Sequence, residues 1–434
     1  MGRSDLSISR AARVAFVLAA LLGGAAIVSG QDRSTDQIIK FHQSRVAADP
    51  DDPLAHNRLA GAYIQKAREG GDLTYYALAE TAARRSVTLL PRGPSAATAT
   101  TVLAVVHLAR HEFGEALTRA REALDLDPVD AAPHAIAGDA LIELGDYETA
   151  AQTYARMAGL EGPRRPDSRV AYLRFLHGDA TGAIAGMRRA VEVVHATRPT
   201  GEPTAWARAQ LADLLFHTGD LDGAAAAYRE SLAAAPGYHR ALAGSARVRA
   251  AQRRYREAVE GYQKALGVIP LPEYAAALGD VYTRMGREAD ARRQYALVEY
   301  IGKLSELNRV VYNRELALYY ADHGVRLADA LALARTELQA RRDIYTHDVL
   351  AWALYKNGRA REALEPMAQA LRLGTPDARL LFHAGMIHHA LGEADAARDY
   401  LGRALALNPS FHVIQAEVAT KTLAELNRRA PARP

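Results

Sequence analysis

The feature of this sequence that most constrains its fold is an internal repeat of about 34 residues. Residues 205–236 and 378–409 align without a gap. Both segments have a small or apolar pair at positions seven and eight, glycine at fifteen, alanine at twenty and proline at the end. A repeat this short cannot bury a core of its own, so each copy has to bury its apolar face against its neighbours. We therefore expect a stack of repeats, although 434 residues would ordinarily suggest two to four globular domains.

The same pattern continues along most of the chain. Matching positions define ten consecutive repeats, which begin at Pro53, Ala97, Ala131, Arg164, Ala205, His239, Pro272, Val310, Ile344 and Ala378. The alanine at position twenty recurs because only a very small side chain lets two antiparallel helices approach closely where they cross. A larger residue, often Tyr or Met, follows four positions later, and glycine stands at the middle turn of most repeats. Each repeat is therefore predicted to be a pair of antiparallel helices.

This combination of spacing, residue size and turn residues resembles the tetratricopeptide repeat, a helix-turn-helix unit of about 34 residues. The resemblance covers residues 53–411. It implies an all-α fold, an α-solenoid that forms a right-handed superhelix of about ten repeats. Residues 31–52 are expected to form an N-terminal capping helix and residues 412–434 a C-terminal capping helix and tail, because the ends of a solenoid need a polar outer face.

Three insertions interrupt the regular spacing. Residues 68–74 and residues 197–203 contain glycine or proline and are expected to form loops. The third insertion adds four residues to the seventh repeat, about one helical turn, so we expect a longer second helix toward residues 301–307.

The first 30 residues have the pattern of an export signal. Basic residues precede an apolar run over residues 14–28, and the small residues Ser29 and Gly30 follow it. This run is shorter than the roughly 20 residues of a membrane-spanning helix and matches a secretory signal peptide. Residues 1–30 are interpreted as a signal peptide, with an uncleaved N-terminal membrane anchor as the alternative. The repeats are then periplasmic or secreted, or they lie outside the cytoplasm on an inner-membrane anchor.

Composition and motifs exclude several classes of function. The chain has no cysteine, which excludes disulfides, cysteine-bound metals and thiol catalysis. Its 54 basic and 50 acidic residues are interspersed, so no basic surface for nucleic acid is expected. Histidines are grouped at His107 and His111 and at His383, His388 and His389. Their spacing matches no zinc motif, and neither a catalytic triad nor a phosphate-binding loop appears. The sequence predicts no enzyme activity, no cofactor and no metal site.

The resemblance also implies where a partner would bind. In the family, the first helix of each repeat lines a concave groove, mainly through positions two, five, six, nine, twelve and thirteen. Here these positions carry both tryptophans and several other aromatic and charged residues, which are typical of binding surfaces. The candidate groove residues are Tyr172, Phe175, Trp206, Asp213, Phe216, His217, Asp280, Arg284, Tyr345, Trp352, Tyr355, Lys356, Phe382 and His383. The predicted partner is an extended peptide or an amphipathic helix. For Trp352 and Phe382, packing between adjacent first helices is the alternative.

The sequence thus predicts a non-catalytic, exported scaffold or adaptor that binds a protein or peptide in the groove. An alternative is an accessory factor in envelope assembly or polysaccharide export, which exported members of the family often resemble. The family's carboxylate clamp for chaperone C-termini is not expected, because Thr101, Val105 and Ile136 stand at positions where that clamp needs Lys or Asn. Contact with a membrane is expected only through residues 14–28, if they are retained.

Overall fold

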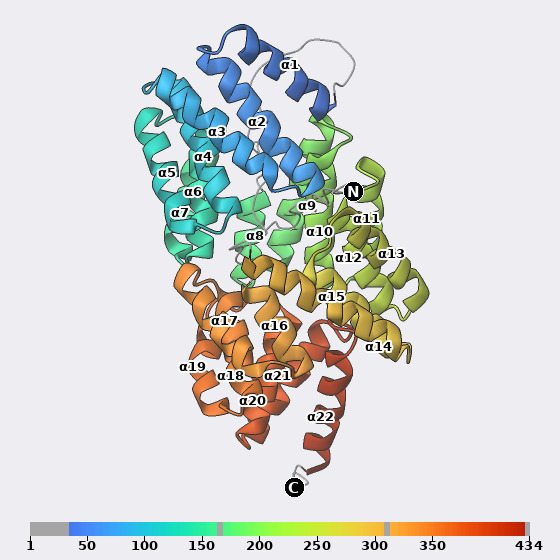
Figure 1. The fold of residues 1–434 in the computed structure, drawn as a ribbon. Helices are drawn as coiled ribbons and strands as arrows, with labels where there is room; N and C mark the ends of the chain where they lie inside the picture. Colours follow the sequence, from blue (N-terminus) through green and yellow to red (C-terminus); the bar gives the residue numbers. More distant parts are fainter. Residues whose placement is uncertain (1–33, 163–167, 308–312, 430–434) are drawn as a thin grey trace. The chain divides into compact units, whose positions relative to one another are not determined.

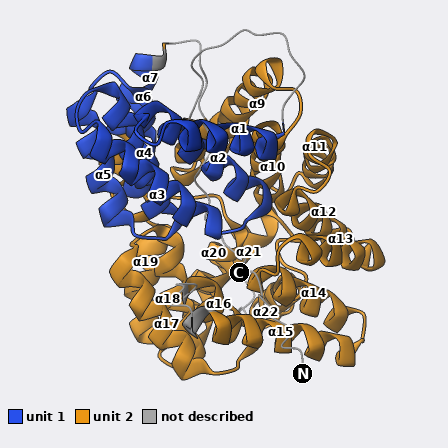
Figure 2. Cartoon of the chain, turned by 45° about the horizontal axis from the view of Figure 1, so that its top comes forward, with its two compact units in different colours: residues 1–141, 152–161 blue, residues 142–151, 162–434 orange. Residues whose placement is uncertain are grey.

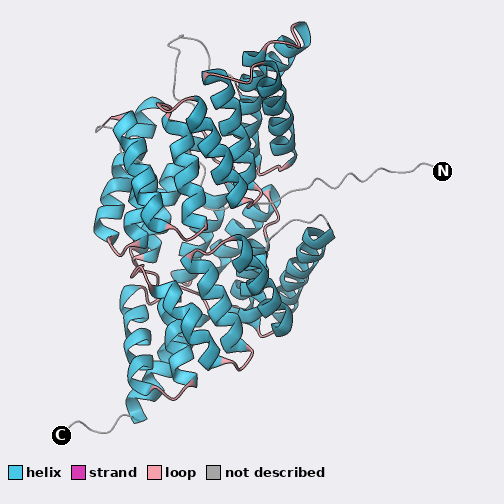
Figure 3. Ribbon diagram, turned by 90° about the vertical axis from the view of Figure 1, so that its left-hand side faces the viewer, coloured by secondary structure: helices cyan, strands magenta, loops and turns pink. Residues whose placement is uncertain are grey.

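The structure is a computed structural model that describes residues 34–162, 168–307 and 313–429. The predicted export signal, residues 1–30, lies outside the described residues. The described part of the chain consists of 22 α-helices joined by short turns and contains no β-strand (Figures 1 and 3). Among these helices, none combines the length and the hydropathy that crossing a bilayer requires. The prediction of an all-α fold is confirmed.

The helices follow one another as the pairs that the repeat predicts. In chain order, they are α1 (Thr35–Ala48), α2 (Pro53–Gly70), α3 (Thr74–Leu89), α4 (Pro94–Ala109), α5 (Phe113–Leu126), α6 (Ala131–Glu143), α7 (Tyr147–Glu161), α8 (Ser168–Leu176), α9 (Ala180–Thr197), α10 (Glu202–His217), α11 (Leu221–Ala234), α12 (His239–Ala251), α13 (Tyr255–Val268), α14 (Pro272–Arg284), α15 (Glu288–Leu307), α16 (Asn313–His323), α17 (Leu327–Ala340), α18 (Ile344–Lys356), α19 (Ala360–Leu371), α20 (Ala378–Ala390), α21 (Ala394–Leu407) and α22 (Gln415–Arg429). The ten pairs run from α2–α3 to α20–α21, with α1 and α22 outside them. Each first helix begins at its expected start or within four residues of it.

The chain forms two compact units, which Figure 2 shows in different colours. Unit 1 consists of residues 1–141 and 152–161, and unit 2 consists of residues 142–151 and 162–434. Within each unit, the two helices of a pair pack along each other, and each pair packs on the next pair in the chain. This is the stacking of an α-solenoid, in which neighbouring repeats bury each other's apolar faces.

The recurring small residues lie where helices come closest. At position twenty, Ala116, Ala224 and Ala397 are completely buried. At position eight, glycine leaves room for the large residue of the paired helix. A Cβ atom on Gly279 would lie 2.4 Å from the ring of Tyr295, closer than any real contact. Small residues on one helix and large residues on its partner therefore set the spacing within a pair.

The insertions differ in part from the sequence-based expectation. Helix α2 continues to Gly70, so the loop expected at residues 68–74 is shorter than predicted. Gly71 caps the helix, since its φ of 70° is left-handed and its N–H donates to the carbonyl of Ala67 at 2.7 Å. Within the insertion at 197–203, residues 198–201 connect α9 to α10, and α15 is lengthened to Leu307, both as expected.

Within unit 2, the first helices of successive pairs touch one another. Contacts join α10 to α12, α12 to α14, α14 to α16, α16 to α18 and α18 to α20. Second helices of successive pairs show no contact of comparable extent among the described residues. A stack in which one layer touches itself curves toward that layer, so the first helices form the inner layer of unit 2. We call the surface of these first helices the inner face.

Candidate functional site

The fourteen candidate groove residues lie on five first helices of unit 2, namely α8, α10, α14, α18 and α20. Six of them are buried, and these are Phe175, Phe216, Asp280, Trp352, Phe382 and His383. Seven are half-buried, and these are Tyr172, Trp206, Asp213, His217, Tyr345, Tyr355 and Lys356. Arg284 is exposed. Phenylalanine side chains and Trp352 on this surface are thus buried, whereas the tyrosines and the charged groups other than Asp280 remain at least partly accessible.

An aromatic cluster on α18 and α20 has Trp352 at its centre. The indole ring stacks on His383 with 4.0 Å between ring centroids and on Tyr355 with 4.8 Å, and it lies 5.7 Å from Phe382. The ammonium group of Lys356 lies 5.5 Å from the same ring, within the range of a cation–π contact. Trp352 is only 4 % exposed and Phe382 only 2 %. Both rings therefore pack between adjacent first helices, while Tyr355 and Lys356 form the accessible edge of the cluster.

Two carboxylates, the half-buried Asp322 and the buried Asp348, fix the orientation of this cluster. The indole Nε1 of Trp352 donates to Asp322 Oδ1 on α16 at 2.7 Å, and His383 Nδ1 lies 2.8 Å from Asp348 Oδ1. Because a buried donor without a partner costs free energy, these hydrogen bonds hold both rings in one orientation. Asp348 stands at position five of the ninth repeat, one of the groove positions, whereas Asp322 was not identified from the sequence.

A second cluster joins α8 and α10. The ring of His217 lies 5.7 Å from that of Phe175, and its Nδ1 lies 3.4 Å from Asp377, the residue that caps α20. Burial lowers the pKa of His217 despite the nearby charge of Asp377. On the neighbouring helix, the guanidinium group of Arg247 lies 4.2 Å above the ring of Phe216. His217 of repeat five therefore contacts the residue that caps the first helix of repeat ten, and Phe175 of repeat four packs against His217.

A third cluster surrounds Asp280 on α14. Its Oδ1 accepts a hydrogen bond from the hydroxyl of Tyr295 at 2.8 Å and lies 2.8 Å from Nε2 of His323. Its Oδ2 lies 3.5 Å from Nε2 of His412. Burial opposes charge on His323, but the hydrogen bond to Asp280 and the charge of that carboxylate outweigh it and raise the pKa of His323.

The pair of Tyr295 and Asp280 is one case of a recurring arrangement. Tyr154 donates to Asp139 at 2.7 Å and Tyr228 donates to Asp213 at 2.5 Å, each across the same separation of 15 residues. The recurrence of Asp at position nine with Tyr at position twenty-four is a sequence signal that would have identified these pairs.

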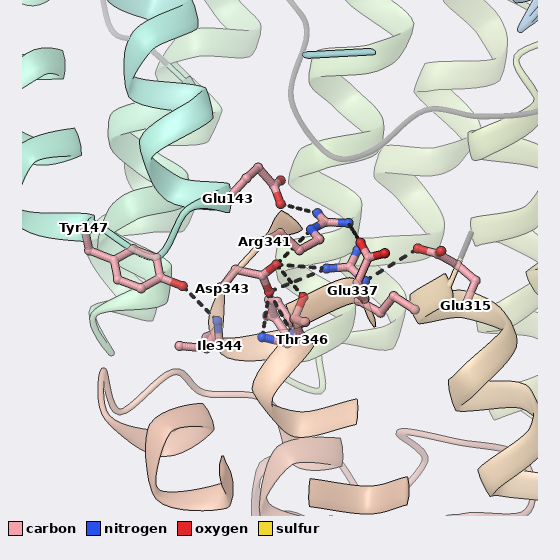
Figure 4. A network of polar contacts seen from close by, with 10 residues as sticks. Glu143, Tyr147, Glu315, Glu337, Arg341, Asp343, Ile344 and Thr346 are labelled. Atoms are coloured by element: carbon pink, nitrogen blue, oxygen red, sulfur yellow. Dashed lines mark hydrogen bonds and ion pairs between the residues drawn. The ribbon is translucent and has the colours of Figure 1, made fainter. Parts of the chain in front are cut away.

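Unit 2 also contains a buried charge network between two turns that are far apart in the sequence (Figure 4). Arg341, at the end of α17, is 1 % exposed and forms an ion pair with Glu143, at the end of α6. Its Nε lies 3.0 Å from Asp343 Oδ2, and its Nη1 lies 3.6 Å from Glu337 Oε1. A backbone hydrogen bond joins the same two turns, since Arg342 N–H donates to the carbonyl of Glu143 at 2.8 Å.

Asp343 connects this network to the start of α18. Its Oδ1 accepts hydrogen bonds from the N–H groups of Tyr345 at 2.7 Å and Thr346 at 3.0 Å, so it caps the helix. Arg314 lies 3.3 Å from its Oδ2. The next amide, that of Ile344, donates to the hydroxyl of Tyr147 at 2.9 Å. The end of one repeat and the middle turn of another are thereby joined by both charged and neutral groups.

The carboxylates of the network differ in their proton affinity. Burial raises the pKa of Glu143 and raises that of Glu337 to about 7, and the charge of Arg341 only partly opposes this effect. For Asp343, burial acts in the same direction, but Arg341, Arg314 and the hydrogen bonds from Thr346 outweigh it and lower the pKa. The lowered pKa keeps the carboxyl group of Asp343 ionised near neutral pH.

Two similar contacts follow at the next two turns. Thr375 Oγ1 donates to the carbonyl of Leu176 at 2.5 Å, and Asn408 Nδ2 donates to the carbonyl of Phe216 at 2.7 Å. The three middle turns involved each contain a glycine with positive φ, and these are Gly145, Gly178 and Gly219. A Cβ atom on them would lie 2.4 Å, 3.2 Å and 2.5 Å, respectively, from a backbone oxygen of the facing segment. We call these three contacts the turn-to-turn contacts.

Two of the grouped histidines form local contacts. His107 Nδ1 lies 2.6 Å from Glu112, and His388 Nδ1 lies 2.5 Å from Glu393. Both acids stand at the start of the following helix. Within the described ranges of the chain, no group of three or more His, Asp or Glu side chains is arranged to hold a metal ion.

Comparison with known families matches the tetratricopeptide repeat to residues 101–168, 171–239 and 349–410. These three matched stretches support the tetratricopeptide repeat family for the chain. This result agrees with the ten helix pairs and with the family that the sequence pattern indicated. The fold is one that typically serves as a scaffold for contacts between proteins.

Solved structures with a similar fold come from several organisms. Yeast Tom70 is 13 % identical, with 92 % of this chain and 94 % of that chain covered and a TM-score of 0.38. A human IFIT1 dimer with PPP-AAAA is 14 % identical, with 85 % and 94 % covered and a TM-score of 0.45. A tetratricopeptide repeat protein from Parabacteroides merdae is 16 % identical, with 59 % and 96 % covered and a TM-score of 0.35. A search of curated proteins found no match to the chain.

Proposed function

We propose that the protein is a non-catalytic scaffold that binds a segment of another protein on the inner face of unit 2. The observation that carries this proposal is the pairing of accessible aromatic and charged groups at one edge of the inner face. Tyr355 and Lys356 are half-buried there, above the buried rings of Trp352 and Phe382. An aromatic anchor with a charged neighbour on a rigid support is the usual composition of an energetically important contact.

The rigidity of this edge supports the same proposal. The indole of Trp352 is fixed by its hydrogen bond to Asp322, and the stack of Trp352 on His383 is fixed by Asp348. A partner side chain that settles against Tyr355 and Lys356 therefore meets groups that are already ordered. Less conformational entropy is then lost on binding, which favours affinity.

The test uses one double variant of the inner face and one matched variant of an outer helix. We expect a chain of residues 31–434 to retain a protein from cell-envelope extract and the variant Tyr355→Ala with Lys356→Glu to lose at least tenfold in affinity for it. The control is Tyr400→Ala with Arg403→Glu on α21, where the guanidinium group likewise lies 5.4 Å from the tyrosine ring. Equal retention by both variants would refute binding at the inner face.

We also propose that the protein acts outside the cytoplasm. The basic start, the apolar run at residues 14–28 and the small residues Ser29 and Gly30 support this localisation. N-terminal sequencing of the protein from the envelope and the medium tests it. A mature N-terminus near Gln31 is the expected result for a cleaved signal, an intact N-terminus in the inner membrane indicates an anchor, and recovery from the cytoplasm contradicts the proposal.

A further inference from the structure

A segment near the C-terminal end of the described chain lies against the inner face. We call residues 411–417, which follow α21 and include the first turn of α22, the C-terminal segment. The ring of Phe411 lies 5.5 Å from that of Phe382 on α20. Gln415 Nε2 donates to Asp322 Oδ1 on α16 at 2.7 Å, and Glu417 Oε2 pairs with Arg284 Nη1 on α14 at 2.5 Å. The C-terminal segment therefore contacts first helices of repeats seven, eight and ten.

A capping role does not account for these contacts. A capping helix covers the last repeat, and α22 does pack on α21, where Arg398 Nη1 donates to the carbonyl of Leu426 at 3.2 Å. Repeats of a solenoid ordinarily contact only their neighbours. The contacts with Asp322 and Arg284 instead reach two and three repeats back along the inner face. These contacts involve polar groups of earlier repeats, which a helix that caps the last repeat does not have to cover.

The chemistry of these contacts is that of peptide recognition. Asp322 accepts from both Trp352 Nε1 and Gln415 Nε2, and Asp280 faces His412, so the surface offers two carboxylates to donors of the segment. It offers one cation, Arg284, to a carboxylate. The N–H groups of Ile414 and Gln415 lie 3.2 Å and 3.3 Å from His412 Nδ1, which starts the helix on the surface.

One atom of the C-terminal segment is poorly matched to its position. Gln415 is 7 % exposed, and its Oε1 is buried without a hydrogen-bond partner. A buried acceptor without a donor weakens binding. A lysine in this position would present only donors to Asp322 and would add a charge of the opposite sign. The surface is thus better suited to a basic side chain than to the glutamine that occupies it.

We propose that the C-terminal segment is an intramolecular ligand of the inner face, and that the partner protein displaces it with the start of a helix that carries the same pattern. This pattern is an aromatic residue for Phe382, a basic residue four positions later for Asp322, and a carboxylate two positions further on for Arg284. The inference rests on the proposed function, because it names the chemistry of the partner that binds there. The segment then competes with the partner, so only a partner with enough affinity to displace the segment is bound.

The test uses a fluorescent synthetic peptide of residues 409–429 and fluorescence anisotropy with the chain of residues 31–434. The tethered segment is present at an effective concentration of roughly millimolar, so the unchanged chain should bind the free peptide weakly. A chain with Gln415→Ala and Glu417→Lys should bind the unchanged peptide at least tenfold more tightly, because its own segment is weakened. A peptide with Gln415→Lys should bind that chain about tenfold more tightly still.

A charge reversal tests the geometry independently. Arg284 and Glu417 are both substantially exposed, so reversing their charges should leave the fold intact, as measured by circular dichroism. A chain with Arg284→Glu should bind a peptide with Glu417→Lys in preference to the unchanged peptide. The matched control chain carries Arg403→Glu on α21 and should behave as the unchanged chain does.

The outcomes separate this inference from the proposed function. Equal peptide binding by the unchanged and weakened chains, no binding by any chain, or no switch of preference with Arg284→Glu would each show that the segment is only a structural element. If these results occur while the Tyr355 and Lys356 variant still loses the envelope partner, the proposed function stands and the intramolecular ligand is refuted. If the peptide binds as expected but no partner is retained, the proposed function fails instead.

Discussion

Replacing Arg341 with methionine should destabilise unit 2 by about 3–5 kcal/mol, the range for removing one partner of a buried ion pair. Methionine retains much of the aliphatic volume of arginine, so the change acts mainly through charge. Three carboxyl groups contact the guanidinium group, namely those of Glu143, Glu337 and Asp343. Figure 4 shows this network, and after the substitution Arg314 still lies beside Asp343.

The destabilisation should depend on pH in a defined direction. The pKa of Glu143 and that of Glu337 are already raised by burial, the latter to about 7, and loss of Arg341 raises both further. A carboxyl group whose pKa is higher in the folded state than its unfolded value of about 4.5 does not lower the free energy of unfolding at a pH below 4.5. It lowers stability as the pH rises through the folded-state pKa. The substitution should therefore cost more at pH 8 than at pH 5, and adding Glu143→Gln should recover part of the loss at pH 8.

Hydrogen exchange measured by mass spectrometry is the appropriate assay, because repeat proteins need not unfold in a single two-state transition. The amides of Arg342 and Ile344 donate across the contact to Glu143 and Tyr147, so their exchange reports its opening. Arg359→Met is the control, because Arg359 forms an exposed ion pair with Glu362. Unchanged exchange in the Arg341 variant, or the same change at pH 5 and pH 8, would refute the electrostatic account.

Two further predictions concern backbone geometry and a buried histidine. Gly219→Ala should destabilise the protein more than Gly286→Ala in thermal denaturation. Both glycines have positive φ, which costs alanine about 1–2 kcal/mol, but only at Gly219 would the new Cβ also lie 2.5 Å from the carbonyl oxygen of Leu407. Burial lowers the pKa of His239 to about 3, so its ring is neutral in the folded protein while the unfolded chain binds a proton below pH 6.5. This histidine should therefore cost about 2 kcal/mol of stability between pH 7 and pH 5, and denaturant unfolding of His239→Gln should show a correspondingly smaller loss. An equal loss in both proteins would contradict that assignment.

The helix pairs were predictable from the sequence because their determinants recur at fixed positions. Ala224 and Ala397 stand at the same place in two repeats and are both completely buried, so self-similarity alone located the helix crossings. The signal is local, because each alanine acts between two helices of one repeat. The same is true of the turn glycines, whose position follows from where a helix has to end.

The contacts that organise unit 2 were not predictable in this way. Arg341 and Asn408 lie between repeats, where the pattern specifies no residue, and their partners are 198 and 192 residues away. The candidate groove could be assigned to the first helices from the sequence. How its side chains pack could not be predicted. The buried indole of Trp352 donates its N–H to Asp322 of the preceding first helix, and the repeat pattern does not specify that carboxylate. Nor does the composition of residues 411–417 show that they reach α14.

The turn-to-turn contacts have a consequence for the number of repeats that this protein can have. A solenoid whose repeats touch only their neighbours can gain or lose one copy in its middle with little effect on the others. Here Glu143, Leu176 and Phe216 meet Arg341, Thr375 and Asn408, and each pair is separated by nearly the same length of chain. If one copy of about 34 residues were inserted between Gly219 and Glu337, the facing turns would shift by one repeat. Each of the three glycines would then lie opposite a turn other than its present partner. Duplication or loss of a repeat in this region would therefore break all three turn-to-turn contacts, so the packing of unit 2 depends on how many repeats lie between the facing turns.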